Sequence, residues 1–139
     1  MNRAIELIGS TISAIFQERR KVVVKLCPTY VHASHGRPGV DEGTGFYREV
    51  HLELIDPLPH VVLGRVPCQL ETASLTVSEE RFDNFVRLPM VGGGQTEFNC
   101  MTSEGESLRV RARGIAVVFY GNQMFPEHEA RRADQTRRG

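Results

Sequence analysis

The sequence lacks several features by which a protein's function is recognised. It has no tryptophan, only three cysteines, and 17 Lys and Arg residues that balance 17 Asp and Glu residues. A chain without net charge has no overall field to attract nucleic acid or a membrane surface, so non-specific nucleic-acid binding is not expected. No apolar run approaches the roughly 20 residues of a transmembrane helix. Near the N-terminus, Glu6, Gly9 and Ser10 interrupt the continuous apolar run that a signal peptide requires. We expect a cytoplasmic protein that does not span a membrane.

The three cysteines are widely spaced, and no pair has the spacing of a zinc or redox motif. Cys27, Cys68 and Cys100 each lie among apolar or strand-like neighbours, which is typical of small buried residues in a reducing compartment. The sequence contains neither a Walker motif nor a dinucleotide-binding fingerprint, and no serine or cysteine lies in a recognisable nucleophile turn. These absences give no ground for assigning a catalytic residue, a metal or a cofactor.

Alternation of apolar and polar residues runs through most of the chain and predicts β-strands. The strand-like runs are 22–26, 46–54, 68–75, 96–102, 108–113 and 115–120, with a short apolar run at 60–66. The clearest hairpin joins 96–102 to 108–113. We predict a mainly β domain over residues 1–126, a small antiparallel β-sandwich or open barrel of about seven or eight strands. Residues 127–139 are expected to form a charged flexible tail.

Two segments are ambiguous between strand and helix. In 5–16 the isoleucines have helical spacing, but the residues from Gly9 to Ser13 are poor helix formers. We therefore favour a β-hairpin between 5–16 and 22–26. In 76–85, Thr76 and Glu79 have the spacing of a capping box, which favours a helix. One or two short helices are thus expected.

The pattern Leu7-Ile8-Gly9-Ser10-Thr11-Ile12, with the run 22–26 and the segment 32–45, resembles small uncharacterised bacterial and phage proteins that open with an Asp/Gly-Ser-x-Ile strand. Residues 81–89 and the hairpin that follows them resemble the same group. The chain departs from that pattern at Gly9, where an acidic residue is expected, and at Arg87, where proline is expected. The resemblance implies a β-rich fold and an extended conformation for 81–89, and it implies no activity.

The segment 30–45 is where we expect a ligand to bind. It contains four glycines, and its candidate ligand-binding residues are His32, His35, Arg37, Asp41 and Thr44. Glycine and proline prevent regular structure, and a long loop inside a small domain is usually functional. Backbone N–H groups of residues 43–45, together with the arginine, would form a nest for an anion such as a phosphorylated small molecule.

A second candidate surface is a stripe of arginines. Arg109, Arg111 and Arg113 share one face of the predicted strand 108–113, where like charges repel unless they are paired. Glu97 on the neighbouring strand would satisfy them. Alternatively, the stripe is a docking face for an acidic partner, and both interpretations stay open.

Three functions follow from these observations. We favour a non-enzymatic binding protein of bacterial or phage origin that recognises a protein partner or an anionic small molecule through residues 30–45. The second hypothesis is a small metal-dependent or acid/base enzyme that uses His32, His35 and Asp41. The third is a structural or assembly component, because exposed strand edges in a small sheet favour pairing with a second copy. A homo-oligomer, most simply a dimer, is expected.

Overall fold

The computed structural model of the protein describes residues 1–60 and 62–124, with no side-chain detail after residue 121. In this part of the chain there are nine strands and no helix, and the strands form one antiparallel sheet. In chain order they are β1 (Asn2–Glu6), β2 (Thr11–Glu18), β3 (Lys21–Ser34), β4 (Gly43–Ile55), β5 (Cys68–Val77), β6 (Glu80–Asp83), β7 (Phe85–Leu88), β8 (Val91–Thr102) and β9 (Ser107–Met124). The mainly β fold is confirmed, and the prediction of short helices is wrong. The predicted tail 127–139 lies outside the described residues.

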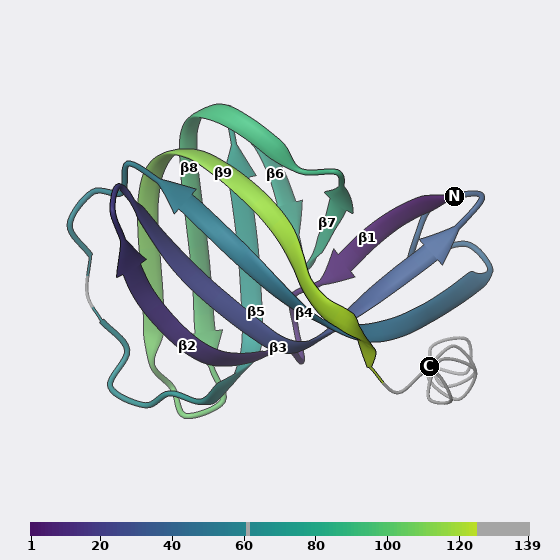
Figure 1. Ribbon diagram of the computed structural model, residues 1–139, viewed down its shortest axis with the longest axis horizontal. Helices are drawn as coiled ribbons and strands as arrows, with labels where there is room; N and C mark the ends of the chain where they lie inside the picture. Colours follow the sequence, from purple (N-terminus) through teal and green to yellow (C-terminus); the bar gives the residue numbers. More distant parts are fainter. Residues whose placement is uncertain (61, 125–139) are drawn as a thin grey trace.

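Six of the strands form a ring. β2 pairs with β3 along one edge and with β5 along the other, and β8, β9 and β4 complete the circuit. The contact that closes the ring is short: Thr11 lies opposite Gln69, and Ile12 lies opposite Cys68. In place of the two sheets of a sandwich, one sheet therefore closes on itself, and Figure 1 shows it as the rolled left-hand part of the molecule.

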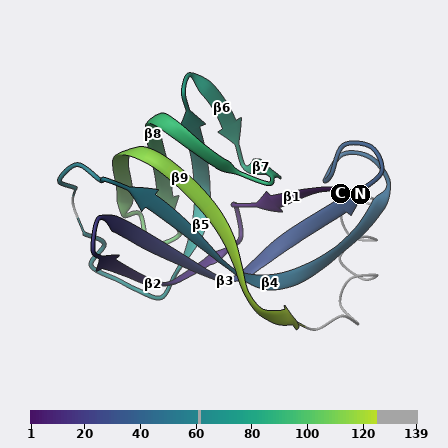
Figure 2. The ribbon, with the colours of Figure 1, turned by 45° about the horizontal axis from the view of Figure 1, so that its top comes forward.

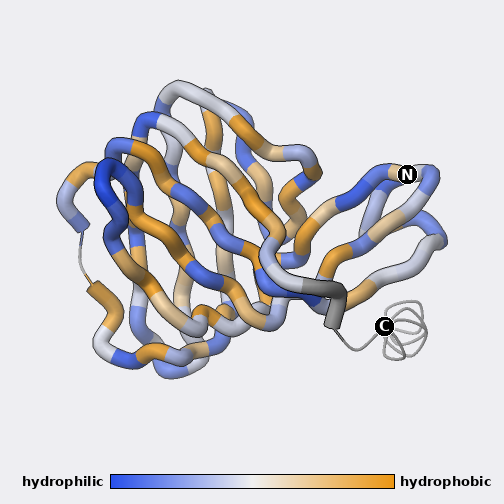
Figure 3. The backbone as a smooth tube through the Cα atoms, viewed as in Figure 1, coloured by the Kyte–Doolittle hydropathy of each residue, from blue (hydrophilic) through white to orange (hydrophobic). Residues whose placement is uncertain are grey.

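Strand periodicity places apolar side chains inside the ring. On β4, Leu52 and Leu54 are fully buried, whereas Glu53 between them lies on the outer face. Phe98 on β8, opposite Leu75 of β5, is the largest fully buried side chain. Figure 3 shows the resulting alternation of hydrophobic and hydrophilic residues along the ring strands. Removal of this apolar surface from water is the main contribution to the stability of the ring.

Beyond the ring, β3 and β4 continue as a long hairpin. Their register shifts between Leu26 and Thr29, where Pro28 has no N–H group to donate to the ladder. Past this shift, β3 pairs with the start of β4 on one side and with β1 on the other, and β7 pairs with β1. We call β1, β7 and the outer parts of β3 and β4 the arm, and the hairpin turn 35–42 the tip. Figures 1 and 2 show the arm projecting from the ring.

Tight turns replace the predicted helices. The segment 5–16 forms two strands, β1 and β2, separated at Gly9, which has a φ of +89°. The predicted hairpin between the second of these strands and β3 is confirmed. In 76–85, Ser78 and Glu79 have φ values of 48° and 75°, and two successive residues with positive φ are typical of a tight β-hairpin turn. They join β5 to β6. Within the described residues there is also no helix whose length and hydrophobicity would let it cross a bilayer.

Candidate functional site

The segment 30–45 is half strand and half turn. β3 continues to Ser34 and β4 begins at Gly43, so only the tip between them is irregular. The prediction of a long irregular loop is therefore wrong for about half of its length, and the candidate residues are distributed between two strands and a turn.

Two glycines in β4 allow the hairpin strands to approach closely. A Cβ atom on Gly43 would overlap the carbonyl oxygen of Ala33, and a Cβ atom on Gly45 would overlap the ring of Tyr30. Glycine is the residue that permits such an approach within a strand. These glycines therefore serve the packing of the arm.

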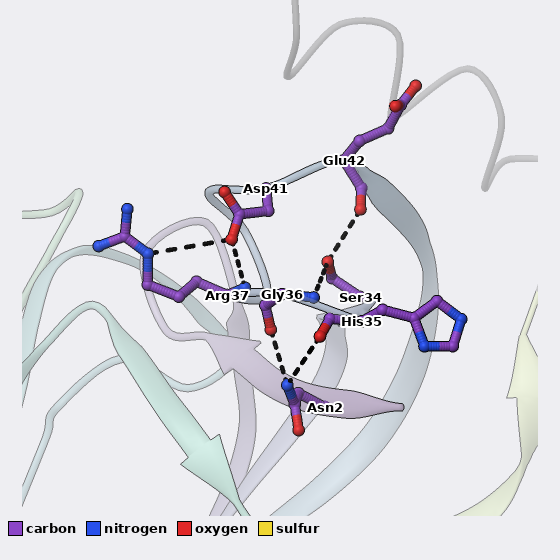
Figure 4. A network of polar contacts seen from close by, with 7 residues as sticks. All are labelled: Asn2, Ser34, His35, Gly36, Arg37, Asp41 and Glu42. Carbon is purple, nitrogen blue, oxygen red and sulfur yellow. Dashed lines mark hydrogen bonds and ion pairs between the residues drawn. The ribbon is translucent and has the colours of Figure 1, made fainter.

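The tip is held by hydrogen bonds among its own groups. The N–H group of Arg37 donates to Oδ2 of Asp41 at 2.6 Å, and Nε of Arg37 lies 3.9 Å from the same oxygen. The carbonyl oxygen of Arg37 accepts from the N–H groups of Val40 at 3.1 Å and of Asp41 at 2.8 Å. Figure 4 shows the Arg37 and Asp41 side chains on the same side of the turn. The tip thus has a conformation that hydrogen bonds among its own backbone and the Asp41 side chain stabilise.

Ser34 and Asn2 attach the tip to the strands below it. Oγ of Ser34 donates to the carbonyl of Glu42 at 2.8 Å and accepts from the N–H group of Gly36 at 3.0 Å. Nδ2 of Asn2 donates to the carbonyl of Gly36 at 2.8 Å and lies 3.4 Å from that of His35. Figure 4 shows that these contacts cross the base of the turn. They connect β1, β3 and the tip into one unit.

These bonds occupy four backbone N–H groups of the tip. The N–H groups of Gly36, Arg37, Val40 and Asp41 all donate within the arm, and residues 43–45 lie in the β3–β4 ladder. An anion nest requires successive N–H groups that are free and point to one place. Successive N–H groups at Gly36 and Arg37, and at Val40 and Asp41, are therefore not free to form such a nest.

His32 lies inside the arm rather than at the tip. Its side chain is buried, and its Nε2 lies 2.7 Å from Oε1 of Glu6 on β1. Its ring meets the rings of Tyr30 and Phe85 edge-on, at centroid distances of 4.7 and 5.4 Å. The tip closes over this cluster, because a Cβ atom on Gly39 would overlap the Phe85 ring. His32 therefore takes part in the packing of the arm, and Glu6 satisfies its polar nitrogen.

The other candidate ligand-binding residues are exposed at the end of the arm. His35, Arg37 and Asp41 lie in the tip, and Thr44 follows it on β4. Contacts join Arg37 to Asp41 and His32 to Glu6, so the histidine and carboxylate pairs expected for an acid/base site are not the pairs that form. Among the described residues, no group of three or more His, Cys, Asp and Glu side chains lies close enough together to hold a metal ion.

The arginine stripe lies on the outer face of β9, where Glu97 of β8 contacts two of its members. Nε of Arg109 donates to Oε1 of Glu97, and Nε of Arg111 lies 3.4 Å from the same oxygen. The hydrogen bond from Arg109 holds the pKa of the Glu97 carboxyl below its ordinary value, although burial opposes this shift. Arg113 is exposed and forms no hydrogen bond or ion pair with any described residue.

The three cysteines are free thiols. Burial inside the ring raises the pKa of Cys100 to about 12, and burial also raises the pKa of Cys68 and of the half-buried Cys27. A nucleophilic thiol needs a lowered pKa. The raised pKa values disfavour a nucleophilic role for these thiols.

Sequence reasoning missed two residues that shape the tip. Val40 is 65% exposed, and the available signal was an apolar residue in the middle of a glycine-rich turn. Asn2 holds the carbonyl of Gly36 from 34 positions away in the chain. No local pattern indicates such a contact.

No protein-family model matches the chain, and comparisons with curated proteins and with solved structures also gave no match.

Proposed function

We propose that the protein is a non-enzymatic binding protein that presents the tip of its arm to a protein partner. The observation that carries this proposal is an exposed turn whose backbone is already hydrogen-bonded within the chain. A turn of fixed conformation loses little conformational entropy when it is bound. It can therefore be recognised by shape.

The side chains at the tip suit a protein surface. Val40 is the apolar centre, and Arg37, Asp41 and Glu42 surround it in the sequence, with His35 at the base of the turn. An apolar centre with a charged rim is the usual composition of a small protein–protein contact. The partner would offer an apolar pocket for the valine and polar groups for the rim.

A second candidate function is assembly of several copies of this chain. β7 ends the strand order and pairs only with β1, and residues 43–46 of β4 pair only with β3 among the described strands. Both edges of the arm therefore carry backbone groups without a strand partner, and such edges favour pairing with another chain. Light scattering on the purified protein tests this candidate, which a strictly monomeric mass at all concentrations would exclude.

Charge substitution at the tip tests the favoured function. Tagged wild-type protein, Val40→Asp and Val62→Asp are used to capture binding proteins from cells that encode the chain, and each captured protein is then purified and measured directly. Val62 is the matched control because it is a 72% exposed valine on another connection. A carboxylate in place of a valine that fills an apolar pocket is expected to weaken binding by about tenfold or more.

The control variant is expected to bind as the wild type does. Equal affinity of a purified partner for all three proteins would overturn the proposal, as would the failure of the wild type to bind any purified candidate. Circular dichroism of the variants checks that the sheet is unchanged.

A further inference from the structure

β8 carries an extra residue opposite the arginine stripe. The β8–β9 register shifts between Gly93 and Thr96, so Gly94 and Gln95 of β8 together lie opposite the single residue Arg113 of β9. This is a β-bulge, a feature that redirects side chains and interrupts regular cross-strand pairing. The glycine run that looks like a turn in the sequence is thus part of a strand.

The bulge is anchored by the turn between β5 and β6. The N–H group of Ser78 donates to the carbonyl of Gln95 at 2.8 Å, and its Oγ donates to the carbonyl of Gly93 at 2.9 Å. Gly94 has a φ of +95°, and a Cβ atom there would overlap Oγ of Ser78. Only glycine meets both requirements easily. The bulge is therefore a fixed part of the sheet.

The bulge leaves Arg113 without an acidic residue opposite it on β8. Glu97 lies directly opposite Arg111 in the ladder and contacts both Arg111 and Arg109. The corresponding position opposite Arg113 is taken by Gly94 and Gln95, which carry no charge. Within the described part of the chain, the guanidinium group of Arg113 donates no hydrogen bond. Arg111 shares the carboxylate of Glu97 with Arg109.

These two arginines line a groove of about 600 Å³ on the outer face of β8 and β9. Leu58 forms one wall and is fixed there, because its N–H group donates to the carbonyl of Arg111 at 2.8 Å. The groove has the volume of a small-molecule site, for which about 300–1,000 Å³ is usual. A second hollow of about 310 Å³ is also lined by Leu58 and Arg113. Arg113 is therefore accessible from the groove and from this hollow.

The charges of the groove leave one cation unbalanced. Its lining contains Arg109, Arg111 and Arg113 against Glu79 and Glu97, which is three positive charges minus two negative charges. A carboxylate would neutralise the remaining charge, and a phosphate monoester, with about −1.5 to −2 charges at pH 7, would exceed it. The carboxylates of Glu79 and Glu97 would instead repel a polyanion.

We propose that this groove binds a small molecule that carries one phosphate or carboxylate group, held by Arg113 and Arg111. Guanidinium groups bind both kinds of oxyanion through paired, charge-assisted hydrogen bonds. The hydroxyl of Thr76 and the amide of Gln95 supply neutral hydrogen bonds in the same groove, and Leu58 supplies an apolar contact. The site is separate from the tip of the arm and does not depend on it.

Titration of the purified full chain with inorganic phosphate, and separately with acetate, tests the proposal. Chloride holds the ionic strength constant, and the arginine Nε–H signals are followed by NMR. Saturable shifts of the Arg113 signal are expected, and the probe that produces them identifies the group as phosphate or carboxylate. Followed through the Arg111 signal, Arg113→Ala should weaken binding about tenfold or more, since a hydrogen bond between charged groups contributes about 1.5–3 kcal/mol.

Two further variants make the outcome decisive. Arg37→Ala removes an exposed arginine of the tip and should leave the affinity unchanged, whereas Glu97→Gln releases Arg109 and Arg111 and should tighten binding severalfold. Absence of a saturable shift with either probe would overturn the proposal. Loss of binding in Arg37→Ala but not in Arg113→Ala would also overturn it, because the anion would then bind at the tip.

Discussion

The ring and the arm belong to one sheet, but different contacts hold them. Inside the ring most of the fully buried side chains are apolar, as Phe98 and Leu52 illustrate, and Thr102 on β8 is a polar exception. The tip-facing side of the arm is built instead on His32, its partner Glu6 and the aromatic ring of Phe85. Apolar contacts tolerate adjustment, whereas a buried polar group that loses its partner costs about 1–3 kcal/mol.

The two regions differ in how far the effect of a substitution should spread. The opposite face of the arm, with Ile5 and Val31, joins the apolar core of the ring, so the arm is anchored to the stable part of the fold. Its outer end depends on a few specific contacts around the tip. Substitutions in the ring should therefore affect the whole molecule, and substitutions in the arm should act locally.

The largest effect is expected from Phe98→Ala in the ring. Removal of this fully buried phenyl group leaves a cavity inside the closed sheet. It should lower the free energy of unfolding by about 3–5 kcal/mol. Urea unfolding followed by circular dichroism measures it. A loss below about 1 kcal/mol would mean that the ring interior is not the main source of stability.

The next effect is expected from Gly43→Ala at the base of the tip. The new Cβ atom would overlap the backbone carbonyl of Ala33, which cannot move without separating β3 from β4, so the cost should be about 1–3 kcal/mol. Hydrogen exchange should show faster opening of arm amides and unchanged protection in the ring.

Gly93→Ala is the control for this substitution. A Cβ atom on Gly93 meets nothing within 4 Å, and the change in stability should stay within about 0.5 kcal/mol. Similar destabilisation by both substitutions would contradict the close approach at Gly43.

A smaller effect is expected from Glu6→Gln. The amide keeps the shape of the side chain but removes the carboxylate that lies 2.7 Å from Nε2 of His32, and the loss should be about 1–2 kcal/mol. Chemical denaturation and arm-specific hydrogen exchange measure it. Glu71→Gln, at an exposed position of β5, should change neither, and an equal response of the two variants would remove the distinction between arm and ring.

The smallest effect concerns the pH dependence of the outer face. The pKa of Glu97 is lowered from 4.5 by its hydrogen bond with Arg109, so this contribution to stability is present above the ordinary value and is lost as the pH falls through the lower folded value. Because the pair is solvent-screened, it should amount to less than about 1 kcal/mol. Unfolding measured at pH 7 and at pH 3 should show a shallower loss for Glu97→Gln than for the wild type.

The sequence allowed the longer strands to be predicted, because their information is local. Alternation from Phe46 to Leu54 and in the hairpin around Ser103 corresponds directly to inward and outward side chains. A period of two residues is a property of each strand alone. The β class of the fold and several of its strand pairs followed from this pattern.

The structure of 30–45 could not be predicted in the same way. Gly43 and Gly45 look like signals for a loop, but each is required by a neighbour on another strand, Ala33 or Tyr30. Likewise, Ser78 and Glu79 form a positive-φ turn from residue types that rarely mark one. Such features depend on contacts that a single-sequence pattern does not contain.

For the candidate sites, the sequence indicated which side chains are exposed but not which side chains they contact. Residue type and exposure are linked, so His35, Arg37 and Asp41 were expected on the surface, where they lie. The burial of His32 is accompanied by its contact with Glu6, and the absence of an acidic residue opposite Arg113 on β8 depends on a bulge in that strand. Neither arrangement has a local signature.

The continuity of two strands has a mechanical consequence. β3, with 14 residues, and β4, with 13 residues, each extend as a single strand from the ring to the tip. A pull on the tip therefore acts lengthwise on strands that have a neighbour on both sides within the ring. Sliding them requires many ladder hydrogen bonds to break together, whereas peeling an edge strand breaks them one after another. A partner attached at the tip would thus load the protein in shear, the direction in which a sheet resists force best.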